Sequence, residues 1–151
     1  MVTMHRSVVA AIVAFVAAVP IATFWLVGDL SDAGDPYYLD YLWKASVSES
    51  AVKAVGIAAL APLSAASACL VRAWRPLRQH LPVLRAVLML VLAGEIVAVG
   101  IRVLTAGTSG ANIGAWLFLI LGLPVSAALV VSARTGFTSR ADAQTASTER
   151  K

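Results

Sequence analysis

The sequence predicts an all-α polytopic membrane protein with four transmembrane helices in one bundle and a short interfacial helix in the outer loop. Hydrophobic residues make up 60% of the 151 residues, charged residues only 13%, and the mean hydropathy is +0.83. Soluble domains carry about 25% charged residues. The apolar residues are grouped into four runs of roughly the 20 residues that a spanning helix needs. Lipid offers no partner to backbone N–H and C=O groups, so helices are expected rather than open strands.

The four predicted helices cover residues 7–28, 52–71, 83–104 and 113–131. The first follows His5 and Arg6, as a secretory signal would, but its apolar run is longer than the roughly 7–15 residues of a signal and no small-x-small site precedes a polar boundary. It is therefore predicted to be retained. Residues 1–133 form one transmembrane domain. Residues 134–151 are rich in Ser, Thr, Ala and charge, and they are predicted to be a disordered cytoplasmic tail.

The charged residues predict an orientation in the membrane. The connection between the first two helices holds the acids Asp29, Asp32, Asp35, Asp40 and Glu49. The next connection and the tail are rich in arginine: Arg72, Arg75, Arg78, Arg85, Arg134, Arg140 and Arg150. By the positive-inside rule, both termini are cytoplasmic and the acidic loop is outside. Nine arginines against three lysines suggest a GC-rich bacterial genome, and hence a bacterial inner (cytoplasmic) membrane.

The outer loop is expected to contain the interfacial helix. Asp35 is a good N-cap and Pro36 a good first helical residue. The segment that follows is aromatic and amphipathic, as is typical of a helix lying on a membrane surface. Its aromatic side chains could instead form a lid or a surface that binds a partner. This candidate outer interaction surface consists of Tyr37, Tyr38, Tyr41 and Trp43.

Glu95 is the candidate for an intramembrane functional site. It lies near the middle of the third predicted helix, where an ionisable side chain costs a few kcal/mol or more and normally faces a partner or a water-filled cavity. Low dielectric favours its neutral form, and such a carboxyl could shuttle a proton or bind a cation. The structural alternative is a single interhelical hydrogen bond that stabilises the bundle. Arg102 lies two turns further along the same face, about 10 Å away. It is either the outer mouth of a site around Glu95 or an anchor that reaches the headgroups.

Three prolines and Glu95 are predicted to lie at similar depths in the four helices. Pro20, Pro62 and Pro124 occupy the first, second and fourth helices, and each releases the carbonyl four residues earlier. They are therefore candidates for a helix-kink cavity next to Glu95. Transmembrane helices also tolerate proline without any function. Small residues spaced four apart predict close helix contacts at Gly94 and Ala98, and at Ala61, Ala65 and Cys69.

The residue inventory favours a protein that is not an enzyme. None of the common catalytic or nucleotide-binding motifs is present, the single cysteine excludes an intrachain disulfide, and His5 and His80 lie in separate segments. We therefore predict no metal, no cofactor and no nucleic-acid partner. The predicted role is an accessory, scaffold or interaction subunit whose partners are the lipid bilayer and other membrane proteins or a second copy. The alternative is a small transporter or proton-coupled carrier that uses Glu95.

Overall fold

The chain is a multi-pass membrane protein built from helices, as the sequence predicts. The computed structural model describes residues 6–31, 42–43, 47–78, 80–108 and 112–148, and these contain no strand. Four helical stretches are long and apolar enough to cross a membrane: Arg6–Val27, Glu49–Arg72, Leu81–Thr105 and Ile113–Thr135. The elements in chain order are α1 (Arg6–Val27), α2 (Glu49–Arg72), α3 (Trp74–Leu77), α4 (Leu81–Thr105), α5 (Ile113–Leu117), the π-helix η2 (Phe118–Gly122) and α6 (Leu123–Thr148).

Local sequence signals fix the ends of the first helices. The chain leaves α1 at Gly28, whose φ of 70° is a conformation that favours glycine. α2 begins three residues earlier than predicted because the Ser48 side chain caps it, accepting a hydrogen bond from the backbone N–H of Ala51 at 3.3 Å. α4 begins at Leu81, and Pro82 occupies its first turn, where the missing N–H costs no hydrogen bond.

The last helix differs from the prediction. The sequence predicts that a helix ends at residue 131 and that disorder begins at residue 134, but α6 continues to Thr148. The reason is that a helix already formed gains one hydrogen bond for each residue added, so extending it avoids the cost of a new nucleus. The segment is rich in alanine, the best helix former, and contains no proline. Residues 149–151 lie outside the described part of the chain.

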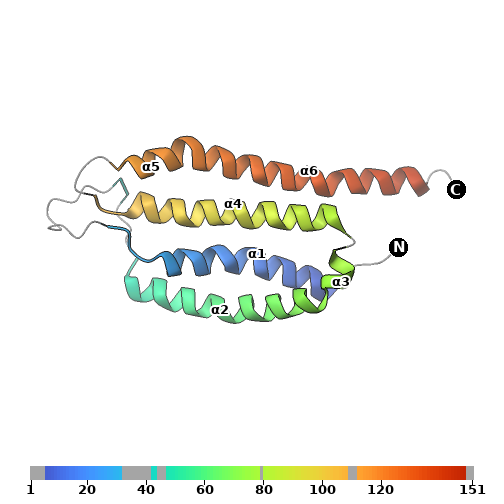
Figure 1. Ribbon diagram of the computed structural model, residues 1–151, viewed down its shortest axis with the longest axis horizontal. Coiled ribbons are helices and arrows are strands. Elements are labelled where there is room, and N and C mark those ends of the chain that lie inside the picture. Colours follow the sequence, from blue (N-terminus) through green and yellow to red (C-terminus); the bar gives the residue numbers. More distant parts are fainter. Residues whose placement is uncertain (1–5, 32–41, 44–46, 79, 109–111, 149–151) are drawn as a thin grey trace.

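The helices form one bundle whose members lie in a row. The spatial order is α2, α1, α4, α6, so that α1 packs between α2 and α4, and α4 packs between α1 and α6 (Figure 1). In the described ranges, α2 contacts neither α4 nor α6. The bundle is therefore open: the two central helices have neighbours on two sides, and the outer helices on one side only.

Each junction in the row places a ring of one helix on a glycine of the next. A Cβ at Gly56 of α2 would overlap the Trp25 ring of α1, and a Cβ at Gly94 of α4 would overlap Pro20. The third junction is made by Phe118 of η2, which packs on Gly100 of α4. Such close approach is the usual basis of helix association in lipid. Of the predicted small-residue contacts, Ala98 is buried, whereas Ala61 and Ala65 are exposed, because α2 contacts α1 through the face that carries Gly56, Ala59 and Ala66.

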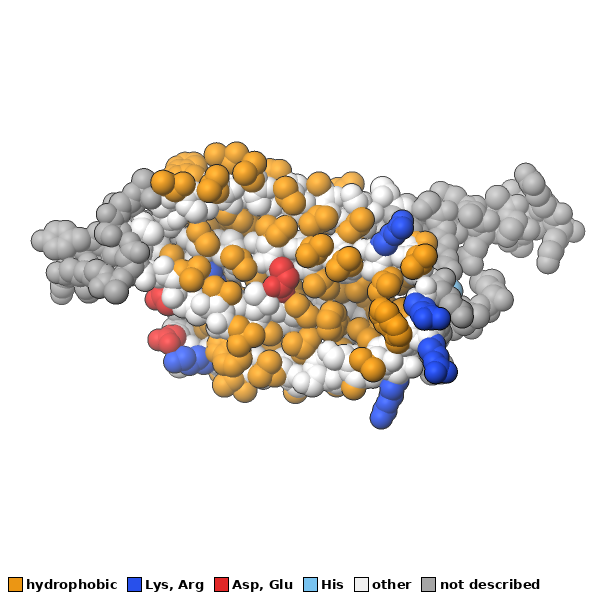
Figure 2. All heavy atoms as spheres, viewed as in Figure 1, with side chains coloured by type: hydrophobic (Ala, Val, Ile, Leu, Met, Phe, Trp, Pro, Cys, Tyr) orange, Lys and Arg blue, Asp and Glu red, His pale blue; other side chains and the backbone are white. Residues whose placement is uncertain are grey.

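Charge is distributed unevenly between the two ends of the bundle. Arginine side chains gather at the end where α3 lies, whereas Lys53 and acidic side chains lie at the opposite end and a further acidic side chain lies at mid-length (Figure 2). Of the acidic residues near the first connection, the structure describes Asp29 and Glu49, and Glu49 pairs with Lys53 at 2.8 Å. The end at α3 is called the basic end below.

Candidate functional site

Glu95 lies near the middle of α4, on a face that carries apolar side chains to the outside of the bundle. The glutamate is half-buried, and its Oε1 atom is buried without a hydrogen-bond partner among the described residues. Large apolar side chains on the same face are exposed: Leu88 by 57%, Leu92 by 45% and Val99 by 39%. Their spacing of four, three and four residues is that of a helix packing seam. We call Leu88, Leu92, Glu95 and Val99 the α4 stripe.

Arg102 does not extend towards Glu95 but crosses to α1. Its Nε–H donates to the backbone carbonyl of Phe24 at 2.6 Å, and its guanidinium carbon lies 4.0 Å from the centroid of the Phe24 ring. Phe24 is in the last turn of α1, where carbonyls have no partner within the helix. α1 has no basic residue in its own last turn. Arg102 therefore satisfies a free carbonyl and places a positive charge at the negative end of the helix dipole.

A second polar link joins the same ends of α1 and α4. The Ser31 hydroxyl donates to Asp29 Oδ1 at 2.7 Å and accepts a hydrogen bond from the backbone N–H of Gly107 at 2.9 Å. The Ser31 backbone N–H also donates to Asp29 Oδ1, at 3.0 Å. These hydrogen bonds from Ser31 lower the pKa of Asp29 below its ordinary value, and the positive charge of Arg102 adds a smaller effect of the same sign.

Asn112 joins α4 to the start of α5. Its Nδ2 donates to the carbonyls of Val103 at 2.9 Å and Ala106 at 3.3 Å, at the end of α4. Its Oδ1 accepts from the backbone N–H of Ala115 at 2.9 Å and so caps α5. One side chain therefore satisfies backbone groups of both helices.

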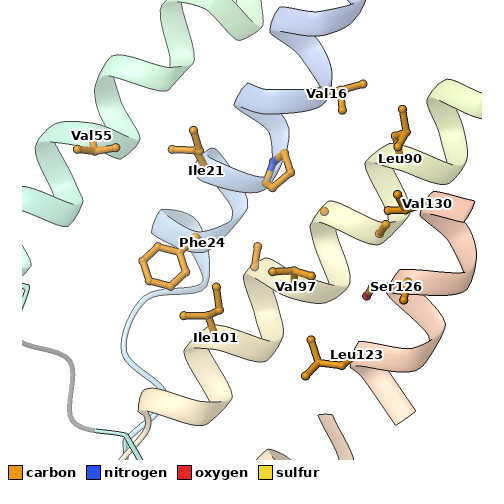
Figure 3. Close-up of a pocket in the computed structure, with 15 residues that line it drawn as sticks. Val16, Ile21, Phe24, Val55, Leu90, Val97, Ile101, Leu123, Ser126 and Val130 are labelled. Atoms are coloured by element: carbon orange, nitrogen blue, oxygen red, sulfur yellow. The ribbon is translucent and has the colours of Figure 1, made fainter. Parts of the chain in front are cut away.

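A cavity is lined by residues of α1, α2, α4 and α6. It has a volume of about 760 Å³, and its lining is apolar except for Ser126, whose hydroxyl donates to the Gly122 carbonyl at 2.8 Å (Figure 3). Pro20 and Gly94 line it, but neither Glu95 nor Arg102 does. We call it the Pro20 cavity. A second cavity of about 570 Å³ lies at the basic end, next to Trp74, and is treated below as the Trp74 cavity.

The structure does not bring the three predicted prolines together. Pro20 lies inside the row, whereas Pro62 and Pro124 are exposed and line neither of the two cavities. The reason is the open row, which keeps α2 and α6 apart. Pro124 follows η2, in which the Leu123 N–H donates to the carbonyl of Phe118, five residues earlier. This wider turn is a common adjustment of a membrane helix to proline.

The predicted outer aromatic surface falls mostly beyond the described residues. Tyr37, Tyr38 and Tyr41 lie in the range 32–41, which the structure leaves undescribed, as does most of the predicted interfacial helix. Trp43 is described, lies in a bend and is 62% exposed. In the described ranges, no three His, Cys, Asp or Glu side chains lie close enough to hold a metal ion.

The polar contacts of Phe24, Ser31 and Asn112 were not predicted from the sequence. Local signals exist for two of them: Asp29-Leu30-Ser31 is a typical Asx-turn sequence, and an asparagine just before an apolar run is a good N-cap. No local signal identifies Phe24, because its partner Arg102 lies 78 residues away. No family model matches the chain, nor does any curated protein or any solved structure.

Proposed function

We propose that this chain is a non-enzymatic interaction subunit of the membrane, which binds another transmembrane segment through the α4 stripe. The observation that carries the proposal is the half-buried Glu95, whose Oε1 atom has no hydrogen-bond donor among the described residues, on the face of α4 where Leu92 and Val99 are exposed. A buried acceptor without a donor costs about 1–3 kcal/mol. A donor from a partner helix would remove that cost.

The composition of the stripe supports a helical partner. Leu88, Leu92 and Val99 present apolar side chains at the spacing that lets two helices interdigitate. In lipid, apolar contact alone gives little specificity, because lipid chains are as apolar as leucine. One hydrogen bond at mid-depth adds about 0.6–2 kcal/mol and selects a partner with a donor at the same level. A second copy, which presents the same stripe, is one candidate partner.

The sequence also predicted an alternative, a small transporter or proton-coupled carrier that uses Glu95. Such a carrier needs a polar path that reaches the carboxyl. Both described cavities have apolar linings and exclude Glu95 and Arg102. No described contact favours this alternative, and it is not proposed further.

Site-specific photo-crosslinking tests the proposal. A photoreactive side chain at Leu92 should give an adduct in the membranes of cells that make the full chain. The same group at Ile57, which is 58% exposed on α2, serves as the control and should give none. The adduct mass distinguishes a second copy from another protein. Equal labelling from both positions, or none from Leu92, would count against the α4 stripe as a binding surface.

A further inference from the structure

The Trp74 cavity opens among apolar side chains at the basic end of the bundle. It has a volume of about 570 Å³, within the range of about 300–1,000 Å³ that is typical of ligand sites. All four neighbouring helices contribute to it, with Phe15 from α1, Leu70 from α2, Trp74 and Leu77 from α3, and Leu84 from α4. Trp74 is 51% exposed and so lies at the opening of the cavity, whereas Leu77 is buried. The short α3, folded back between α2 and α4, closes one end of this space.

Arginines without a described counter-charge neighbour the lining residues of this cavity in the chain, although none is itself a lining residue. Four exposed arginines directly follow lining residues in the chain: Arg72 follows Val71, Arg75 follows Trp74, Arg78 follows Leu77 and Arg85 follows Leu84. The acids whose side chains the structure describes, Asp29, Glu49 and Glu95, lie at the other end or at mid-length, and the Glu49–Lys53 ion pair is at the other end. Figure 2 shows basic side chains around apolar ones at this end.

We propose that the Trp74 cavity binds an anionic phospholipid, with an acyl chain among the apolar lining residues and the phosphate among Arg72, Arg75, Arg78 and Arg85. Guanidinium groups bind phosphate in two-point contacts. Indole rings prefer the depth at which acyl chain meets headgroup, which is where Trp74 lies relative to the arginines. The proposal is independent of the α4 stripe, although Leu88 borders both features.

The apolar Trp74 cavity and the neighbouring arginines together favour an anionic phospholipid over other ligands. A zwitterionic phospholipid fits the apolar part, but its own cationic headgroup offsets the attraction of the arginines. A free phosphate fits the charge but leaves the cavity without an apolar occupant. A lipid with net negative charge satisfies both parts of the site, and basic pockets between membrane helices commonly hold such headgroups.

Quenching of tryptophan fluorescence by brominated lipid tests this site in the full-length protein in vesicles. The probe is phosphatidylglycerol brominated on its acyl chains, diluted into phosphatidylcholine; brominated phosphatidylcholine in the same host is the reference. We expect the anionic probe to quench at a several-fold lower mole fraction than the reference. The additional quenching by the anionic probe should disappear in Trp74→Phe, which retains the other tryptophans. Equal quenching by both lipids would mean that the cavity holds bulk lipid and would overturn the proposal.

Matched arginine variants separate a site from general attraction to a basic surface. Arg75→Gln should raise the mole fraction needed for half-quenching about fivefold. Arg6→Gln removes the same charge near the same end, but Arg6 lies nine residues before Phe15 and so on the opposite side of α1 from that lining residue. Arg6→Gln should therefore change the mole fraction needed for half-quenching by less than twofold. An equal effect of both variants would overturn the proposal. Arg85→Gln gives a second test on another helix should Arg75→Gln disturb α3.

Discussion

Arg102 of α4 holds the end of α1, with its Nε–H on the Phe24 carbonyl at 2.6 Å and its guanidinium over the Phe24 ring at 4.0 Å. One side chain thus caps a helix other than its own and joins the two central helices of the row. Together with the link from Gly107 through Ser31 to Asp29, it makes the end of the bundle opposite the basic end a hydrogen-bonded unit.

Replacing Arg102 should destabilise the bundle strongly. A hydrogen bond from a charged donor contributes about 1.5–3 kcal/mol, and a cation over an aromatic ring about 0.5–2 kcal/mol. We expect Arg102→Gln to lower the free energy of unfolding in detergent by about 2 kcal/mol or more. The unfolding free energy of Arg102→Lys should lie between those of Arg102→Gln and the wild type, because an ammonium group lacks the planar, forked geometry of the guanidinium group. Arg85→Gln, at an exposed position, is the control. Equal stability of Arg102→Gln and Arg85→Gln would refute this role.

Asp29 should make the stability of this end depend on pH. Because hydrogen bonds from Ser31 lower its pKa in the folded state, ionised Asp29 contributes stability above the ordinary carboxyl pKa. That contribution is lost as the pH falls through the lowered value. The difference in unfolding free energy between wild type and Asp29→Asn should therefore be constant near neutral pH and vanish in strong acid. Ser31→Ala should shrink the difference at neutral pH. A difference that grows as the pH falls would have the wrong sign.

Gly100 should resist substitution because the Phe118 ring occupies the space of its side chain. In an ordinary helix interior, glycine to alanine stabilises by about 1 kcal/mol. At Gly100 a Cβ would overlap Phe118, so Gly100→Ala is expected to destabilise by about 1–3 kcal/mol. Adding Phe118→Leu should restore part of the loss. A double-mutant cycle in detergent measures the coupling, and additive effects would argue against this contact.

Asn112 should couple the end of α4 to the start of α5 through two kinds of hydrogen bond. Asn112→Ala removes the hydrogen bond that Oδ1 accepts from the Ala115 N–H and the two hydrogen bonds that Nδ2 donates to carbonyls at the end of α4. We expect the free energy of unfolding to fall by about 1–2 kcal/mol. Asn112→Asp keeps the acceptor for Ala115 but loses the donors. Hydrogen exchange at the Ala115 amide should therefore increase in Asn112→Ala and much less in Asn112→Asp. Comparable exchange in the two variants would show that the cap is unimportant.

The sequence alone predicts the helices well but not how they are arranged. Apolar run lengths locate the spans, and signals such as Ser48 and Pro82 explain their ends. The row was not predictable, because the rings of Trp25, Pro20 and Phe118 lie on glycines of other helices and no periodicity specifies such pairs. The continuation of α6 beyond residue 131 was not predicted, because the polar composition of the tail does not take account of the helix that precedes it.

The candidate site, like the fold, was predictable from the sequence only in part. The depth of Glu95 follows from its position in an apolar run, whereas the absence of a donor at its Oε1 atom is known only from the structure. The inward turn of Arg102 was likewise not predictable, because a spanning helix with an arginine near its end reads as anchored to headgroups. The three prolines share a depth in the sequence but are separated by the order of the helices.

The most direct test of the account is the crosslinking yield from Leu92 in Glu95 variants of the full chain. Glu95→Leu removes the acceptor and Glu95→Gln retains one, while both keep the apolar stripe. If the stripe binds a segment that donates to Oε1, Glu95→Leu loses most of the adduct and Glu95→Gln keeps it. An unchanged yield in Glu95→Leu would contradict the proposed role of this carboxyl.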